Sequence, residues 1–213
     1  LTVDEMSDLI GVGNFSTNYI KSIDKPKTID PDGPAGFTQF MSFIGGSVYD
    51  TCFYCSETII GATWNVELAE KMGNAIGNES LVGDENGDGR TYSGWYAPAV
   101  NIHRTPFSGR NWEYYSEDGL ISGKMAAGVI RGAMDKGVYC YVKHFAINDQ
   151  ETNRDTGTGL ITWLSEQSMR EIYLKPFELA VKDGGTTAMM SSFNRIGTVW
   201  AGGSYELLTE ILR

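Results

Sequence analysis

Residues 138–145 read Val-Tyr-Cys-Tyr-Val-Lys-His-Phe, a run of β-branched and aromatic side chains that ends in a lysine and a histidine. This composition predicts a β-strand. We expect a helix on each side of it, at about 119–136 and at about 162–182, with Pro176 as a kink inside the second. A strand enclosed between two helices is typical of an α/β protein.

The alternation of strand and helix extends outward from this run. Further strands are predicted at 96–102 and 186–193, and further helices at 65–82 and 203–213. Strands that alternate with helices of this length are expected to be parallel and joined by right-handed crossovers. A doubly wound sheet and a β/α barrel both satisfy this pattern.

Polar side chains follow each predicted strand at its C-terminal end. They are Asn101, His103, Arg104, Lys143, His144, Ser192 and Asn194. In a barrel those strand ends converge on one mouth, where active sites are built, so we expect a TIM-type β/α barrel. A complete barrel needs about 250 residues, and this chain of 213 residues stops inside a predicted helix. The sequence therefore predicts one domain over 1–213, a barrel that is incomplete at its C-terminal end.

The overall charge argues against two classes of partner. The chain carries a formal net charge of −10, whereas nucleic acids and anionic membranes attract basic surfaces. No apolar stretch reaches the roughly 20 residues that span a bilayer. No signal peptide is recognisable and the chain opens at Leu1 rather than Met, so its location in the cell is open, with the cytoplasm favoured.

Cysteine and histidine usage predicts neither a metal site nor a cofactor. Three cysteines make an odd count, and the Cys52–Cys55 pair has no second pair to complete a zinc site, so we expect reduced thiols. His103 and His144 are the only histidines and lack metal-ligand spacing. Residues 84–89 imitate half of a calcium loop without the glutamate at its twelfth position, which favours a solvated turn.

The loop 103–118 has a composition that suits carbohydrate. It combines arginines, acids and aromatic side chains, and aromatic faces stack on sugars while ionic groups hydrogen-bond the hydroxyls. Lys143 and His144 end a buried strand, and because adjacent strand residues point to opposite faces, at least one should face the barrel interior. The alternatives are a structural ion pair at Lys143 and His144, a structural loop fixed by its arginines, and a purely structural His103.

Five segments of the chain resemble glycoside hydrolase family 3, in its β-glucosidase-like branch. They follow the family's order and cover most of the chain. They are Asp32-Gly-Pro-Ala-Gly-Phe37, the run from Asn101 to Asp118, the run from Lys143 to Arg154, Arg170-Glu-Ile-Tyr-Leu-Lys-Pro-Phe-Glu178 and Met190-Ser-Ser-Phe-Asn194. The resemblance implies a β/α barrel that hydrolyses terminal β-linked glycosides with retention, without metal or cofactor.

The resemblance also implies roles for individual residues. Asp32 matches the carboxylate that accepts hydrogen bonds from sugar hydroxyls far from the bond that breaks. Arg110 looks like the arginine that helps to hold the ring in the innermost subsite. Lys143 and His144 match the Lys-His pair that donates to the ring hydroxyls.

Two positions depart from the family's pattern. Phe193 falls at a substrate-site position where many members carry a tyrosine beside the nucleophile, and a phenyl ring cannot hydrogen-bond a carboxylate. Thr38 falls where some members have a second sugar-binding arginine. Both departures are expected to alter the tuning or the specificity of the site.

The resemblance places no catalytic carboxylate inside the chain. The nucleophilic aspartate is expected about a dozen residues beyond Arg213, and the general acid/base glutamate is expected from another domain. Retaining hydrolysis needs both carboxylates. Four acids of the chain are expected instead to fix loops, as partners of Arg104, Arg154 and backbone amides. They are Glu113, Glu117, Asp118 and Glu151.

The β-N-acetylglucosaminidase branch of the family is disfavoured. It expects a Pro-Gly-His-Gly stretch where 146–151 read Ala-Ile-Asn-Asp-Gln-Glu. We therefore expect part of a β-glucosidase-like enzyme that acts on a small β-glycoside or oligosaccharide and joins the remaining domains of a longer chain. Unpaired strand edges also predict self-association. The alternatives are a non-catalytic sugar-binding or structural domain and, more distantly, a doubly wound binding protein.

Overall fold

A computed structural model of the chain describes residues 1–11, 15–38, 51–83, 91–154, 157 and 159–213. Residues 84–89, the half calcium loop of the sequence, lie outside the described residues. In the part of the chain that is described, no helix is both long enough and apolar enough to cross a membrane.

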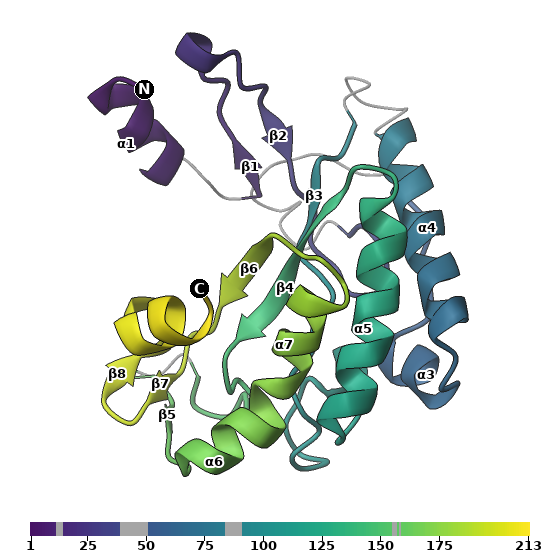
Figure 1. Cartoon of the computed structure of the whole chain (residues 1–213), viewed down its shortest axis with the longest axis vertical. Helices are drawn as coiled ribbons and strands as arrows, with labels where there is room; N and C mark the ends of the chain where they lie inside the picture. The colour runs from purple at the N-terminus through teal and green to yellow at the C-terminus, as the bar shows by residue number, and fades with distance from the viewer. Residues whose placement is uncertain (12–14, 39–50, 84–90, 155–156, 158) are drawn as a thin grey trace.

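A parallel three-stranded sheet forms the centre of the molecule (Figure 1). Its strands are β3 (Gly94–Trp95), β4 (Tyr139–Phe145) and β6 (Ala188–Ser191), in the order β3-β4-β6. Each pair is parallel, as the alternation of strands and helices predicted.

The first predicted strand, 96–102, is wrong in its bounds. Regular pairing ends at Trp95, and beyond it single bridges join Tyr96 to Asp32 and Ala99 to Lys143. Pro98 lies between these two bridges and has no N–H to donate, which interrupts the ladder. The predicted strands at 138–145 and 186–193 are present with shorter bounds.

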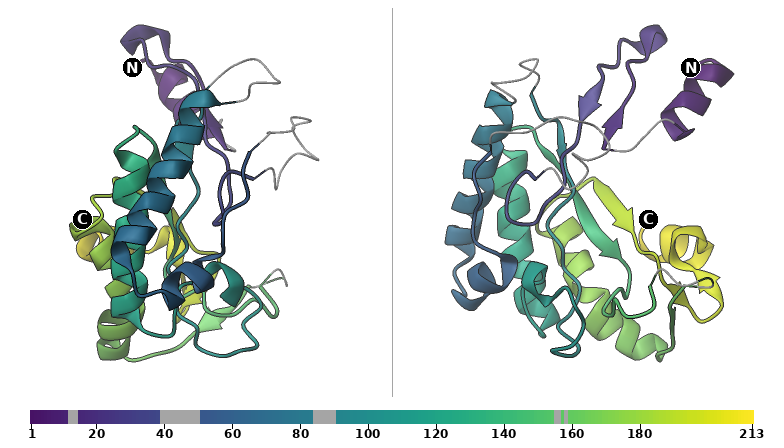
Figure 2. Two further views of the ribbon diagram at one scale, coloured as in Figure 1. Left: turned by 90° about the vertical axis from the view of Figure 1, so that its right-hand side faces the viewer. Right: turned by 180° about the vertical axis from the view of Figure 1, so that it is seen from behind.

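Helices α4 (Val66–Val82), α5 (Gly119–Met134) and α7 (Lys175–Lys182) form one layer against the sheet, with α5 in the middle (Figures 1 and 2). Helices on a single face favour the barrel, because a doubly wound sheet carries helices on both faces. The bounds of α4 and α5 confirm the predicted helices at 65–82 and 119–136. Asn65 and Asp118 begin them by accepting the amides of Leu68 and Ile121.

The glycine-rich face of α5 packs on a helix and not on the sheet. A Cβ atom at Gly132 would lie 2.1 Å from the carbonyl oxygen of Glu70 in α4. A Cβ atom at Gly73 of α4 would lie 2.0 Å from the carbonyl oxygen of Val129. Glycines therefore allow the backbones of α4 and α5 to approach closely.

The predicted helix at 162–182 consists of several pieces. The short strand β5 (Ile161–Thr162) precedes α6 (Glu166–Ser168), a π-helical turn over Met169–Tyr173 and α7. Pro176 stands in the first turn of α7, where a missing N–H is tolerated, so the irregularity comes before the proline and not at it.

The rest of the chain adds small elements. At the N-terminal end lie α1 (Val3–Gly11) and the antiparallel pair β1 (Ser16–Thr17) and β2 (Thr28–Ile29), with short turns and α3 (Glu57–Ala62) between them and α4. Strand β5 also pairs with a hairpin, β7 (Arg195–Ile196) and β8 (Val199–Trp200), which the sequence reading missed. A π-helical turn over Glu206–Ile211 stands where a helix was predicted at 203–213.

The core lies between the sheet and the helical layer. Its largest fully buried side chains include Trp95, Phe37, Phe145, Phe177 and Ile76. Parallel strands whose crossover helices all pack on one face make a sector of a TIM-type barrel, and no closed barrel is formed by the described residues. The sector brings the C-terminal ends of its strands to one edge, where most of the predicted polar side chains lie.

Candidate functional site

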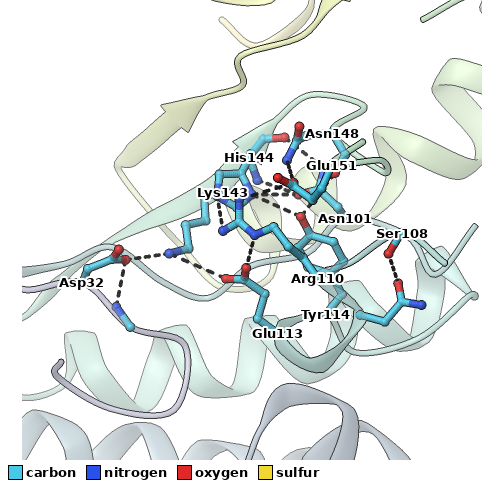
Figure 3. A network of polar contacts seen from close by, with 12 residues as sticks. Asp32, Asn101, Ser108, Arg110, Glu113, Tyr114, Lys143, His144, Asn148 and Glu151 are labelled. Carbon is cyan, nitrogen blue, oxygen red and sulfur yellow. Dashed lines mark hydrogen bonds and ion pairs between the residues drawn. The ribbon is translucent and has the colours of Figure 1, made fainter. Parts of the chain in front are cut away.

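Four of the five predicted substrate residues meet at the C-terminal end of β4 (Figure 3). Lys143 donates from Nζ to Oδ1 of Asp32 at 2.6 Å, across 111 positions of sequence. His144 follows Lys143 on the same strand, and its Nε2 lies 3.0 Å from Nη2 of Arg110. The fold therefore joins three segments that are far apart in the chain.

Glu113 links the two cations of this cluster. Its Oε1 accepts from Nε of Arg110, and its Oε2 lies 3.8 Å from Nζ of Lys143. The side chains of Lys143 and Glu113 are only 3% and 2% exposed. Lys143 thus lies between two carboxylates, those of Asp32 and Glu113.

Glu113 is therefore a member of the cluster, and its partners are Arg110 and Lys143 in place of the expected Arg104, Arg154 or backbone amides. A 3-10 turn over Asn111–Glu113 places the glutamate three residues after Arg110. That spacing was visible in the sequence and could have indicated the Arg110–Glu113 pair.

His144 is held as a neutral ring. Arg110 has only donors, so Nε2 of His144 accepts its hydrogen bond, and Nδ1 carries the proton toward Oδ1 of Asn101 at 3.3 Å. Burial lowers the pKa of His144 well below its usual range, and the positive charge of Arg110 lowers it further. Asn101 also binds the backbone of His144, accepting from its N–H at 2.8 Å and donating to its carbonyl at 3.0 Å.

Lys143 and His144 both contact the cluster, although they are neighbours on a strand. Regular alternation would send them to opposite faces. The pairing of β4 with β6 shifts register between Val142 and Phe145, so the alternation is broken at these two positions.

Glu57 is a second acid that the sequence reading missed. It is fully buried at the start of α3 and forms no ion pair with another described residue. Burial raises the pKa of Glu57 well above its usual range, and the nearby charge of Glu113 raises it further. A lone glutamate in a helix's first turn gives no local sign of such burial.

Phe193, the fifth predicted residue, lies apart from the four. Its ring is 63% exposed and lies under the guanidinium of Arg154, with Cζ 5.2 Å from the ring centroid. Nη1 of Arg154 pairs with Glu151 at 2.6 Å, and Glu151 lies 3.6 Å from Nη1 of Arg110. Phe193 is therefore connected to the cluster through Arg154 and Glu151.

The expected loop-fixing contacts are present at two acids. Glu151 pairs with Arg154, and Asp118 accepts a hydrogen bond from the amide of Ile121.

Thr38 donates from Oγ1 to the carbonyl of Asp32 at 3.2 Å, so it fixes the backbone of a site residue.

His103 has a structural role in the loop, one of the alternatives left open by the sequence. Its Nε2 lies 2.9 Å from the carbonyl of Asn111 and 2.8 Å from that of Tyr114. Because both partners are acceptors, this nitrogen is the donor, and it holds the turn that carries Glu113.

The cluster balances its charges. Two cations, Arg110 and Lys143, face two carboxylates, Asp32 and Glu113, while His144 is neutral. Such a set offers both donors and acceptors at one place without a net charge, which suits a neutral molecule rich in hydroxyl groups.

No metal-binding group is found within the described residues, where three or more histidine, cysteine or acidic side chains nowhere come together. No disulfide joins the cysteines of the described residues, of which Cys52 and Cys55 are exposed and Cys140 is buried.

Comparison with known proteins gives consistent matches. The sequence pattern described as "Glycosyl hydrolase family 3 N terminal domain" matches residues 44–213. β-Glucosidase A of Butyrivibrio fibrisolvens is 38% identical over 205 residues, which are 96% of this chain and 23% of the relative.

Solved structures agree over the whole chain. β-Glucosidase 3B of Thermotoga neapolitana, in complex with α-D-glucose, superposes with a TM-score of 0.85 at 34% identity, over 100% of this chain and 31% of that one. The GH3 β-glucosidase of Bifidobacterium adolescentis gives 0.87 at 33% identity, over 100% and 29%. The chain thus spans less than a third of the length of each of these relatives.

Proposed function

The chain belongs to glycosyl hydrolase family 3, and from that premise we propose that it supplies most of the innermost sugar-binding subsite of a retaining β-glucosidase-like enzyme. Residues 1–213 would form its barrel domain, incomplete at the C-terminal end. The substrate would be a small β-glycoside or oligosaccharide with an unsubstituted terminal sugar.

One observation supports this function most directly, the Lys143–Asp32 ion pair with Arg110 and Glu113 beside it. Lys143 is held between two carboxylates at a strand end, with its ammonium group 2.6 Å from Asp32. Asp32 is 21% exposed and Arg110 is 20% exposed, so both can reach a ligand. Each charge-assisted hydrogen bond to a sugar hydroxyl would contribute roughly 1.5–3 kcal/mol.

The chemical step needs two carboxylates from outside these residues. Retaining hydrolysis uses a nucleophile and a general acid/base about 5–5.5 Å apart. In this proposal the nucleophilic aspartate follows Arg213 and the acid/base glutamate comes from another domain. The 213-residue chain by itself would therefore not hydrolyse p-nitrophenyl β-glucoside.

The test uses a longer form of the protein that includes the nucleophile. Lys143→Ala and Asp32→Ala should each lower kcat/KM at least about tenfold, because about 1.4 kcal/mol of transition-state stabilisation corresponds to one decade. Part of the loss should appear in kcat, since hydroxyl contacts strengthen as the ring distorts. Lys124→Ala, an exposed lysine that pairs with Asp183, is the matched control and should leave both constants unchanged.

Two outcomes would contradict the proposal. One is full kcat/KM in Lys143→Ala together with complete loss in a folded His103→Ala, which would mean that the roles are misassigned. The other is turnover by the 213-residue chain that disappears on mutation of one of its own acids, which would place the chemistry inside these residues.

A non-catalytic sugar-binding domain is the second candidate, and Phe193 favours it. Its ring carries no hydroxyl to orient a nucleophile, and one face of it contacts the guanidinium of Arg154 instead. The first twenty or so residues after Arg213 distinguish the two functions. An aspartate that closes the next strand favours the enzyme, and its replacement favours the binding domain.

We also propose that the 213-residue chain self-associates when produced alone. Strand β6 is an outer strand of the central sheet as described, and Phe193, Val199 and Trp200 beyond it are exposed. Outer strands and apolar side chains of this kind favour pairing between copies. A monomer in light scattering up to millimolar concentration, without binding of a hydrophobic dye, would exclude this.

A further inference from the structure

A cavity of about 110 Å³ lies near the cluster but is lined by different residues. Its lining includes Arg104, Asp149, Gln150, Thr162, Trp163 and Tyr173. A cavity needs only about 10–15 Å³ to hold one water molecule. This cavity is large enough for a ligand of several heavy atoms.

The charged groups of this cavity are only partly satisfied. Asp149 is 4% exposed, and its Oδ1 accepts the amide of Ile102 at 2.7 Å. Its other oxygen, Oδ2, is buried and has no hydrogen-bond partner among the described residues. Arg104 donates one hydrogen bond, to Gln150 at 3.2 Å, and forms no ion pair with Asp149 within the described part of the chain.

The two charges restrict the kind of ligand. Burial raises the pKa of Asp149 to about 7, and the amide of Ile102 and the charge of Arg104 only partly oppose this. Above pH 7, where Asp149 is mostly ionised, it would repel an anion, and Arg104 would repel a cation. A hydroxyl group can donate to Asp149 and accept from Arg104, so it satisfies both.

An aromatic face completes the lining. Trp163 is 74% exposed although it borders the cavity, so its indole is available to a ligand. Aromatic rings pack against the C–H-rich faces of ring-shaped polyols while polar groups bind the hydroxyls. The combination of one donor, one acceptor and one exposed indole fits a monosaccharide.

We infer that this cavity is a second binding site, for a neutral polyhydroxylated molecule such as a monosaccharide, separate from the cluster around Lys143. Two neighbouring residues belong to different sites. Nδ2 of Asn148 donates a hydrogen bond to Glu151, which lies beside Arg110 of the cluster, whereas Asp149 lines the cavity. The inference goes beyond the proposed function and does not depend on it.

The test follows the indole of Trp163 in protein labelled with 5-fluorotryptophan. The ¹⁹F resonance of Trp163 is the one that disappears from the spectrum of Trp163→Phe. D-glucose is then titrated into the labelled protein. We expect a saturable shift of this resonance that persists in Asp32→Asn, where the first cluster is impaired. Arg104→Ala should raise the Kd for glucose at least tenfold. Arg170→Ala is the matched control, because this exposed arginine pairs with Glu166 and neither residue lines the cavity, and it should change nothing.

A second variant and two charged probes complete the test. Asp149→Asn keeps an acceptor for the amide of Ile102 and should remain folded while it weakens glucose binding. Inorganic phosphate and ammonium should produce no saturable shift. The inference is overturned if glucose leaves the resonance unmoved, if Arg104→Ala binds as well as the wild type, or if either ion shifts the resonance as glucose does. Loss of the shift in Asp32→Asn would also overturn it, because the two sites would then be one.

Discussion

The cluster around Lys143 and the cavity around Asp149 have two stretches of chain in common, but their buried charges differ in pairing. Arg110 and Arg104 come from the loop after residue 102, and His144 and Asp149 come from the end of β4 and the segment after it. In the cluster, every cation faces a carboxylate at close range. In the cavity, Oδ2 of the buried Asp149 has no hydrogen-bond partner among the described residues.

The difference shows that the free-energy cost of burying a charged group depends on whether an opposite charge lies beside it, and not on burial alone. Lys143 and Glu113 are almost completely enclosed, yet each offsets the desolvation of the other. Asp149 is equally enclosed without such a partner, and burial raises its pKa to about 7. The cavity is therefore expected to respond to a change in pH through Asp149.

Removal of Glu113 should give the largest effect on stability. Glu113→Ala removes the carboxylate nearest to Arg110 and one of the two carboxylates beside Lys143. Arg110 is partly buried and Lys143 is almost completely buried. Loss of one partner from a buried pair costs about 3–5 kcal/mol. Urea unfolding measures this, and Glu117→Ala, an exposed glutamate of the same loop, should stay within about 0.5 kcal/mol of the wild type. A loss below about 1 kcal/mol for Glu113→Ala would mean that the cluster does not depend on pairing.

The pH dependence of stability should show the next largest effect, at Asp149. Its pKa is about 7 in the folded protein and about 3.9 in an unfolded chain. At this group the folded state thus binds more protons, and its contribution to the free energy of unfolding should fall as pH rises from 4 to 7, by up to about 1.4 kcal/mol per pH unit. The difference in the free energy of unfolding between the wild type and Asp149→Asn, measured by urea unfolding at each pH, should change by that slope. Identical slopes in the two proteins would show that Asp149 is ionised throughout.

An exposed ion pair should give the smallest effect and serves as the reference for both regions. Lys124 and Asp183 join α5 to the end of α7 at 2.6 Å, but their side chains are 50% and 34% exposed. Exposed pairs contribute about 0–1 kcal/mol. Lys124→Met should therefore change the free energy of unfolding by less than about 1 kcal/mol. A loss as large as that of Glu113→Ala would remove the distinction between buried and exposed pairs.

Much of the fold followed from local sequence signals. The helices over Val66–Val82 and Gly119–Met134 were predicted to within two residues, because apolar spacing is a local signal that repeats every turn. The bounds of the first strand were wrong, because Pro98 interrupts its ladder. The hairpin over 195–200 was missed, because its two strands have only two residues each.

The sequence indicated Asp32, Arg110, Lys143 and His144 as site residues, with roles implied by the resemblance to a family, and the structure brings these four side chains together. Their role in binding a sugar stays a prediction. Glu113 was assigned the wrong partner, although its spacing from Arg110 was available. Glu57 and the cavity at Asp149 carried no local signal.

The sequence by itself determined the order of strands and helices, the parallel sheet and the polar strand ends, since these depend on periodicity and on residues close together in the chain. Only the tertiary structure decided which charges are paired, because Lys143 and Asp32 are 111 positions apart. It also decided which carboxyls are enclosed without an ion pair among the described residues, as Glu57 and Asp149 are. The physical reason is that desolvation depends on every atom packed around a group, whichever part of the chain supplies it.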